Sequence, residues 1–241
     1  MNPTARSELL RDLKERLRRW EGLERSAVGE VHSTGVPELD RLLPRGGLGD
    51  GAIFEWLSKG EGEGSATLTL LLAARVLEQG GALVVIDEAR EFYPPGAAYL
   101  GIDLERTVVV QPRNVRDALW AFEQALRSPA ASVVFGWCTK LGDRDFRRLQ
   151  LAAEAGDGLG FVLRPLECRR EPSWAEARLL VEALPGRNTV APGRRLRIEV
   201  LQRRGGFGGE AITVELTHEA GHVHLAAAVA DPTPARRARR A

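Results

Sequence analysis

The sequence predicts an α/β fold: a doubly wound, mostly parallel sheet with antiparallel strands toward its carboxyl end and a helix ahead of it. One observation is a βαβ unit, in which a strand at 52–57, a glycine-rich loop at 59–64 and a helix at 66–79 precede a strand at 82–86. Strands and helices then keep alternating, which is typical of a parallel sheet. After residue 177 only strands and glycine-rich turns follow, which indicates antiparallel pairing.

The remaining elements follow from the same patterns. A short helix at 37–43 is closed by Gly46 and Gly47. Pro94 and Pro95 are expected to break a loop before a short helix at 96–100. Further strands are expected at 107–111, 131–137 and 160–164, and further helices at 115–127 and 146–155. The antiparallel strands are expected at 179–184, 194–202, 210–216 and 221–228.

Composition limits the function classes. The chain has 241 residues, is 44% hydrophobic and carries a net charge of +1, so no overall field favours nucleic acid or an acidic substrate. No membrane span, signal sequence or metal site is expected, and Cys138 and Cys168 are expected to be reduced core residues of a cytoplasmic protein. The three histidines at 218, 222 and 224 are interpreted as surface residues of paired strands, and Trp56, Trp120, Trp137 and Trp174 as core or interface anchors.

Three regions are predicted along the chain: an amphipathic helix and linker at 1–30, a core domain at 31–229 and a disordered basic tail at 230–241. The first helix has an apolar stripe at helical spacing. That stripe either packs on the core or docks on a partner, and its candidate contacts are Leu9, Leu10, Leu13, Leu17 and Trp20.

The glycine-rich loop has the setting of a phosphate-binding P-loop, because it joins a strand to a helix N-terminus. Its chemistry differs from such a loop. Alignment on Gly64 places Ser65 where a phosphate-binding lysine belongs and Ala66 where a magnesium-binding hydroxyl belongs, and the loop also carries two glutamates. We therefore expect a degenerate, non-functional nucleotide site without a bound cofactor, formed by Gly60, Gly62, Gly64, Ser65, Ala66 and Thr67.

Three blocks of sequence resemble the bacterial recombinase RecA: STGVPELDRLLPRGGLGDG, the P-loop unit, and VVIDEAREFYPPGAAYLGIDLERTVVVQP. The resemblance implies a RecA-like core over about residues 33–202. It also implies that ATP hydrolysis is lost. The catalytic glutamate of RecA aligns with Ala89, next to Glu88, and its magnesium-supporting aspartate aligns with Gly136 or Trp137. We therefore expect that this chain is not an enzyme.

The two segments that resemble the DNA-binding loops of RecA are short, namely 139–144 and 185–195. A solvated basic turn is the simpler interpretation of the second segment. Weak contact with nucleic acid phosphates stays open there, through Arg187, Arg194 and Arg195.

A RecA-like core with this P-loop, an N-terminal helix and the stretch EVLQRRGG at 199–206 resembles the ImuA family, which is related to RecA and SulA. The resemblance implies a non-catalytic adaptor of damage-induced translesion synthesis, in contact with RecA, with ImuB and, through ImuB, with the polymerase DnaE2. Two alternatives stay open: a nucleotide- or DNA-responsive regulator of the SOS response, and a cell-division inhibitor similar to SulA.

Overall fold

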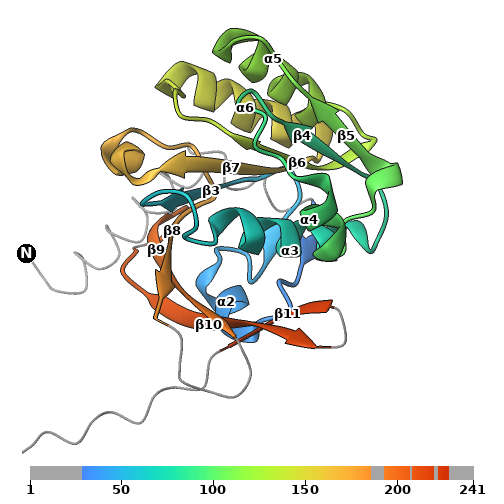
Figure 1. Ribbon diagram of the computed structural model, residues 1–241. Helices are drawn as coiled ribbons and strands as arrows, with labels where there is room; N and C mark the ends of the chain where they lie inside the picture. The colour runs from blue at the N-terminus through green and yellow to red at the C-terminus, as the bar shows by residue number, and fades with distance from the viewer. Residues whose placement is uncertain (1–28, 186–192, 207, 220–221, 228–241) are drawn as a thin grey trace, which may run out of the picture.

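A computed structural model describes residues 29–185, 193–206, 208–219 and 222–227. One nine-stranded sheet runs through this part of the chain, in the order β11-β10-β9-β8-β3-β7-β6-β4-β5 (Figure 1). Its strands are β3 (Ile53–Ser58), β4 (Ala82–Ile86), β5 (Thr107–Val110), β6 (Ala131–Trp137), β7 (Leu159–Pro165), β8 (Ala177–Leu184), β9 (Arg194–Arg203), β10 (Ala211–Glu219) and β11 (His222–Ala227). Neighbours from β5 to β8 pair in parallel, and those from β8 to β11 pair antiparallel.

Helices cover both faces of the parallel strands, as the alternating pattern predicts. The helices are α2 (Pro37–Leu42), α3 (Ser65–Leu77), α4 (Pro94–Tyr99), α5 (Val115–Leu126) and α6 (Asp143–Gly156). Residues of α2, α3 and α4 share one buried core with one face of the sheet, and residues of α5 and α6 share a second core with the other face. The fold is therefore a doubly wound α/β domain with an antiparallel extension.

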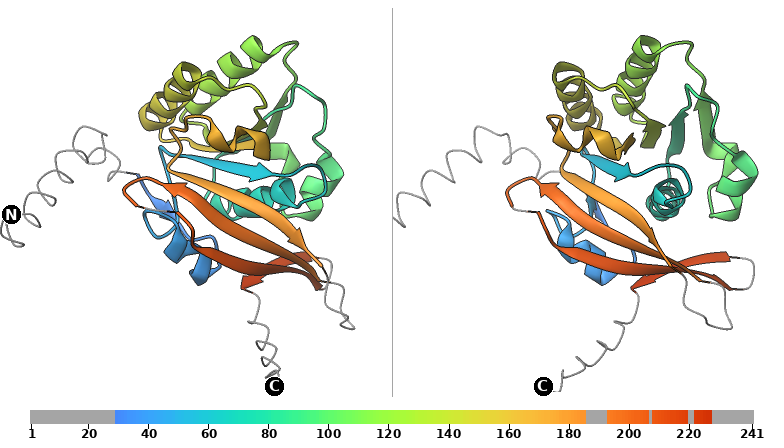
Figure 2. Two further views of the ribbon diagram at one scale, coloured as in Figure 1. Left: turned by 90° about the vertical axis from the view of Figure 1, so that its left-hand side faces the viewer. Right: turned by 60° about the vertical axis from the view of Figure 1, so that its left-hand side comes forward.

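The antiparallel strands curl around α2 and α3, so that these helices lie between the two halves of the sheet (Figure 2). Leu196 and Ile198 of β9 and Val214 and Leu216 of β10 belong to the same buried core as Leu72 of α3. The extension is thus packed into the domain.

Several predicted boundaries are wrong. Pro94 and Pro95 do not precede α4 in a loop: they begin it, because the first helical turn needs no N–H donor and favours the φ angle of proline. Helix α6 begins at Asp143, which leaves only 138–142 between β6 and α6. A small ribbon of β1 (Val31–His32) with β2 (Leu48–Gly49), and the 3₁₀ turns Leu104–Arg106 and Leu166–Arg170, had no clear sequence signal.

The N-terminal helix with its five candidate contacts, Arg187 and the basic tail lie outside the described residues. Within them, Trp56 is a core residue, as predicted, and both cysteines are free and buried. Trp120 is not a core residue: it is 62% exposed.

Candidate functional site

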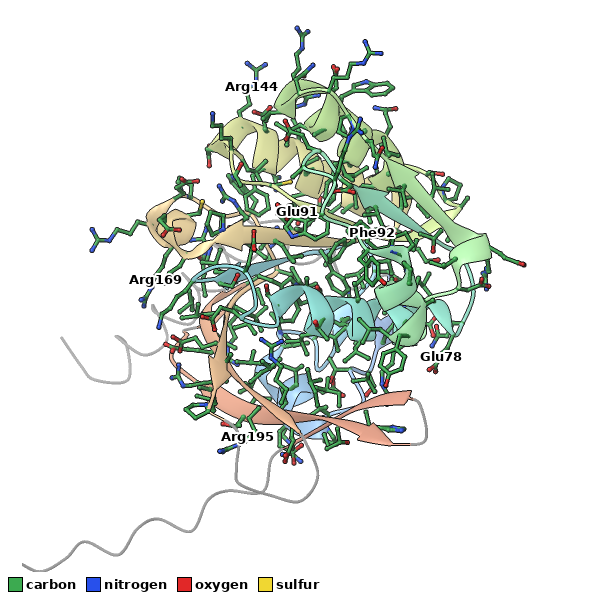
Figure 3. The ribbon with its side chains drawn as sticks, viewed as in Figure 1. Glu78, Glu91, Phe92, Arg144, Arg169 and Arg195 are labelled. Carbon is green, nitrogen blue, oxygen red and sulfur yellow. The ribbon has the colours of Figure 1, made fainter. Side chains whose placement is uncertain are left out.

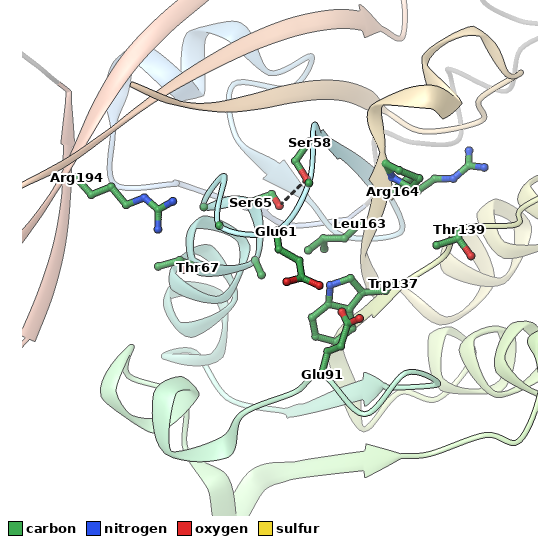
Figure 4. A pocket seen from close by; sticks show the side chains of 15 residues that line it. Ser58, Glu61, Ser65, Thr67, Glu91, Trp137, Thr139, Leu163, Arg164 and Arg194 are labelled. Carbon is green, nitrogen blue, oxygen red and sulfur yellow. Dashed lines mark hydrogen bonds between the residues drawn. The ribbon is translucent and has the colours of Figure 1, made fainter. Parts of the chain in front are cut away.

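A cavity of about 510 Å³ opens at the carboxyl ends of β3, β6 and β7, beside the N-terminus of α3 (Figure 4). All six residues predicted for the degenerate nucleotide site line it: Gly60, Gly62, Gly64, Ser65, Ala66 and Thr67. The other lining residues are Ser58, Glu61, Glu91, Trp137, Thr139, Leu163, Arg164, Pro165 and Arg194.

The backbone of the loop needs glycine. Gly62 and Gly64 have φ angles of 78° and 90°, in the left-handed region, and Gly64 directly precedes the first turn of α3. A Cβ atom on Gly64 would lie 2.7 Å from Cδ2 of Leu196. Strand β9 therefore packs closely against the loop at Gly64.

The first residues of α3 provide hydroxyls but no cation. The Ser65 hydroxyl lies 3.3 Å from the Ser58 hydroxyl, and Ala66 has no polar side-chain atom. Thr69, one turn later, bonds its hydroxyl to the Ser65 carbonyl oxygen at 2.8 Å. The helix N-terminus is thus available to an anion, but no side chain at positions 65 and 66 adds positive charge.

The loop lysine binds elsewhere. Lys59 Nζ lies 2.6 Å from Glu182 Oε1 on β8, and Glu182 also pairs with Arg197 at 3.1 Å. The hydrogen bond from Lys59 lowers the pKa of Glu182, and the same bond raises the pKa of Lys59. Lys59 does not line the cavity.

The two loop glutamates differ in their surroundings. Glu63 accepts a hydrogen bond of 2.7 Å from the backbone N–H of Ala183, beyond the point where β8 pairs with β3. Glu61 lines the cavity and points toward Trp137 (Figure 4). Glu63 therefore accepts a hydrogen bond from a backbone N–H of β8, and Glu61 faces the space where a phosphate would lie.

A third carboxylate, Glu91, was not found by sequence alignment, which considered Ala89 and Glu88. The Asp87 side chain accepts hydrogen bonds from the N–H groups of Glu91 and Phe92, at 2.8 and 3.3 Å, and so turns the chain after β4. This turn brings Glu91 to the cavity wall (Figures 3 and 4). The only available signal was an aspartate at the end of a strand, since Asp often bonds the backbone just after it.

Trp137 stands at the end of β6, where a magnesium-supporting carboxylate would be needed. Its ring packs edge-on against Phe135, with 4.9 Å between the centroids, and it lines the cavity. Gly136 cannot carry a longer side chain, because a Cβ atom there would lie 2.9 Å from the Ile86 carbonyl oxygen. Neither position offers a carboxylate.

The candidate phosphate contacts are not brought together. Arg194 lines the cavity. Arg195 follows it on a strand and therefore points to the other face of the sheet, away from the cavity (Figure 3). Arg187 lies outside the described residues. Of the three, one arginine alone is placed at the site.

A buried ionic network supports the floor of the cavity, and the sequence did not reveal it. Glu55 of β3 is 0% exposed. It accepts hydrogen bonds from Arg164 of β7 at 3.0 Å, from Arg178 of β8 at 2.6 Å and from Ser173 at 2.6 Å.

The same arginines bind the chain that covers them. Arg164 donates to the Cys138 carbonyl oxygen at 2.9 Å and to Glu171 at 2.6 Å. Arg178 donates to the carbonyl oxygens of Arg169 and Glu171. Burial lowers the pKa of Arg164, but its hydrogen bonds to the two glutamates outweigh this and raise it. Arg164, although it lines the cavity, is therefore already neutralised by carboxylates.

Comparison with known proteins agrees with this geometry. The family model of the RecA N-terminal domain matches residues 19–136 of this sequence. The core is RecA-like. The RecA-like chain is 36% identical to the protein RecA of Chlorobium limicola over 111 residues, which is 45% of this chain and 31% of that protein. It is 34% identical to RecA of Streptomyces venezuelae over 105 residues, or 44% of this chain and 28% of that protein.

A second relative is the cell division inhibitor SulA of Photorhabdus laumondii subsp. laumondii, 38% identical over 78 residues, which is 32% of the RecA-like chain and 44% of that protein. These matches agree with a RecA-like core. They span less than half the length of each of these relatives. Within the described residues, no helix is long and apolar enough to cross a membrane, and no group of three metal-ligating side chains is present.

Proposed function

We propose that this RecA-like protein is a non-catalytic accessory protein of damage-induced translesion DNA synthesis, an adaptor of the ImuA type. The observation that carries the proposal is the composition of the P-loop cavity. Its lining has Ser65 and Ala66 at the start of α3, Trp137 at the end of β6, and two acidic side chains, Glu61 and Glu91.

Phosphoryl transfer depends on positive charge around the phosphates and on a metal ion held by the protein. Here the loop lysine pairs with Glu182, Arg164 pairs with Glu55 and Glu171, and Arg194 shares the cavity lining with two carboxylates, Glu61 and Glu91. Glu91 could accept a proton from a water molecule, but the described residues contain no group of three carboxylate, histidine or cysteine side chains that would hold a metal ion beside the phosphates. The residues of the cavity thus support loss of ATP hydrolysis.

The adaptor proposal names partners by resemblance: RecA, ImuB and, through ImuB, the polymerase DnaE2. DNA binding is expected to be weak or absent, because the segment after β6 is short and, of the two candidate phosphate contacts among the described residues, Arg194 lines the cavity and Arg195 does not. The protein is proposed to act in the cytoplasm, where these partners meet damaged DNA.

Calorimetric titration with ATP and Mg²⁺ tests the loss of nucleotide chemistry. We expect no heat for the natural sequence. The variant Ser65→Lys/Ala66→Thr is also expected to hydrolyse no ATP, since the carboxylate at the end of β6 is still missing. Binding at about −8 kcal/mol, a micromolar Kd, would contradict the proposal and favour the nucleotide-responsive regulator.

Affinity purification tests the adaptor role. Tagged protein from cells treated with a DNA-damaging agent is expected to co-purify with ImuB and RecA. The Ser65→Lys/Ala66→Thr variant serves as the matched control, and it should co-purify equally well because the loop is not the proposed contact. If neither ImuB nor RecA co-purifies with the protein of natural sequence, the adaptor role is refuted.

The similarity to a protein named as a cell division inhibitor favours one second candidate, inhibition of division. Expression of the chain in growing bacteria distinguishes it. An inhibitor would produce long filaments, whereas an adaptor would leave cell length unchanged.

A further inference from the structure

A second cavity, of about 440 Å³, lies at the amino-terminal ends of β4 and β6. Its wall includes Gly81, just before β4, and Ala131 and Ser132, at the start of β6. The P-loop cavity lies at the carboxyl end of β6, so the two cavities are at opposite edges of the parallel sheet. They share no lining residue.

Three carboxylates line this second cavity, and they come from separate parts of the chain. Glu30 precedes β1, Asp50 follows β2 and Asp157 follows α6. Among the described residues that form the wall, none is an arginine or a lysine. The lining therefore carries negative charge from three directions.

The arginines near the wall bind other groups or lie at its margin. Arg45 donates to the backbone carbonyl oxygens of Gly29 and Asp50, and Arg127 pairs with Glu123. Arg106 approaches from outside: its Nη2 lies 3.7 Å from the position that a Cβ atom on Gly80 would take. The carboxylates inside the cavity thus keep room for a cation from solvent.

Two helices end at the cavity and add to its negative potential. Helix α3 ends at Leu77, and Gln79 and Gly80 beyond it belong to the wall. Helix α6 ends at Gly156, which lines the cavity together with Asp157. The carbonyl groups at a helix C-terminus carry a partial negative charge that favours a nearby cation.

One buried group of the wall lacks a partner. His32 is only 8% exposed, and its Nε2 lies 2.8 Å from Asp50 Oδ1. Because a carboxylate oxygen accepts, Nε2 carries the proton, and Nδ1 of the neutral ring is then an acceptor. Nδ1 is buried and has no hydrogen-bond partner in the described part of the chain. A ligand with N–H donors would supply the missing bond.

We propose that this cavity binds an alkyl polyamine, a flexible chain of methylene groups that carries several ammonium groups. The ammonium groups would donate to the carboxylates, to His32 and to the carbonyl groups at the helix ends. The methylene groups would contact the apolar part of the wall, which includes Val76, Pro129 and Ala131. This inference does not rest on the proposed adaptor function.

Other cations fit the cavity less well. The described residues contain no group of three His, Cys, Asp or Glu side chains that could hold one metal ion, and the cavity is much larger than an ion. A basic side chain of another protein would bring a single charge. The acceptors of this wall are spread over several elements, which favours a ligand whose charges are spread along its length.

Calorimetric titration of the full chain with spermidine, in about 0.15 M salt, tests the site. We expect saturable binding with a Kd below about 1 mM. The double variant Glu30→Gln/Asp157→Asn removes two charges with little change in shape. Asn also tolerates the φ angle of 54° at position 157, so the fold should be kept. This variant should bind spermidine about tenfold more weakly, or weaker still.

A matched variant and three further probes control for general charge effects. Glu61→Gln/Glu91→Gln removes two carboxylates from the P-loop cavity instead, and it should bind spermidine as the natural sequence does. Triethylene glycol has a similar length without charge and should not bind. Mg²⁺ alone and a short lysine peptide should bind more weakly than spermidine.

Each of the following results would overturn the proposal. The first is the absence of saturable binding of spermidine to the natural sequence. The second is equal affinity of the two double variants, or weakening by the P-loop variant alone. The third is binding of Mg²⁺, of the lysine peptide or of triethylene glycol as tight as that of spermidine. None of these measurements uses RecA or ImuB, so failure of the polyamine site leaves the adaptor function untouched.

Discussion

At the scale of single residues, the least replaceable side chain described is Glu55. It is the one carboxylate that contacts both Arg164 and Arg178, and all three side chains are nearly or fully buried. A buried ion pair adds little stability by itself, but removing Glu55 leaves Arg178 without its carboxylate partner and Arg164 with Glu171 alone. Glu55 is thus needed to neutralise the buried guanidinium groups of Arg164 and Arg178.

We predict that Glu55→Gln lowers the free energy of unfolding by about 3 kcal/mol, since the amide cannot neutralise two buried guanidinium groups. Urea denaturation measures the change. The control is Glu210→Gln, which breaks the exposed pair with Arg203 and should cost less than about 1 kcal/mol. Equal effects of the two substitutions would contradict a structural role for the network.

Burial also determines thiol reactivity. It raises the pKa of Cys138 from 9.0 to about 12, with Arg164 opposing the rise. In a Cys168→Ser variant, we expect Cys138 of the folded protein at pH 8 to react with iodoacetamide about a thousandfold more slowly than in urea, because the thiolate is so much rarer. Because the folded pKa is the higher one, stability should also fall as pH rises from about 9 toward 12. Rapid labelling of the folded protein would refute this.

At the scale of elements, the P-loop is held by β9 as well as by its own turn. Gly64 has a positive φ angle and a Cβ atom there would clash with Leu196, whereas Gly62 has a similar φ angle and open space where a Cβ atom would lie. Substitution of Gly62 therefore measures the effect of backbone strain alone, and substitution of Gly64 measures strain and a packing clash together.

We predict that Gly62→Ala costs about 1 kcal/mol from strain alone, and that Gly64→Ala costs at least 1 kcal/mol more from the clash with Leu196. Thermal denaturation of both variants provides the comparison. In a Leu196→Ala background, Gly64→Ala should cost less than it does in the natural sequence, because the side chain with which it clashes has been shortened. Equal costs for the two glycines would show that β9 does not constrain the loop.

Local pattern predicted most of the strands and helices, because each depends on periodicity within its own segment. The predicted bounds of β4, of β6 and of the loop between β3 and α3 agree with the structure. The ionic network was beyond such prediction, since Glu55 meets Arg164 and Arg178 across 109 and 123 residues of chain. Glu91 was missed because a side-chain turn at Asp87 shifts its position, which an ungapped alignment cannot detect.

At the scale of the whole molecule, the two halves of the sheet share one core around α2 and α3. A destabilising substitution in the antiparallel strands should therefore also destabilise the half of the sheet that carries the P-loop. We predict that Leu216→Ala on β10 lowers the free energy of unfolding by about 2–5 kcal/mol and leaves a single transition. Far-ultraviolet dichroism and tryptophan fluorescence should report the same midpoint, and two separate midpoints would indicate independent halves.

The packing of Leu196 against Gly64 has a consequence for how this sequence can evolve. Strand β9 packs against the loop at Gly64, and this contact is made by the apolar side chain of Leu196. A side chain at position 64 would meet an immediate penalty from Leu196. Selection for a stable fold would thus preserve glycine at position 64, independently of any selection on nucleotide binding.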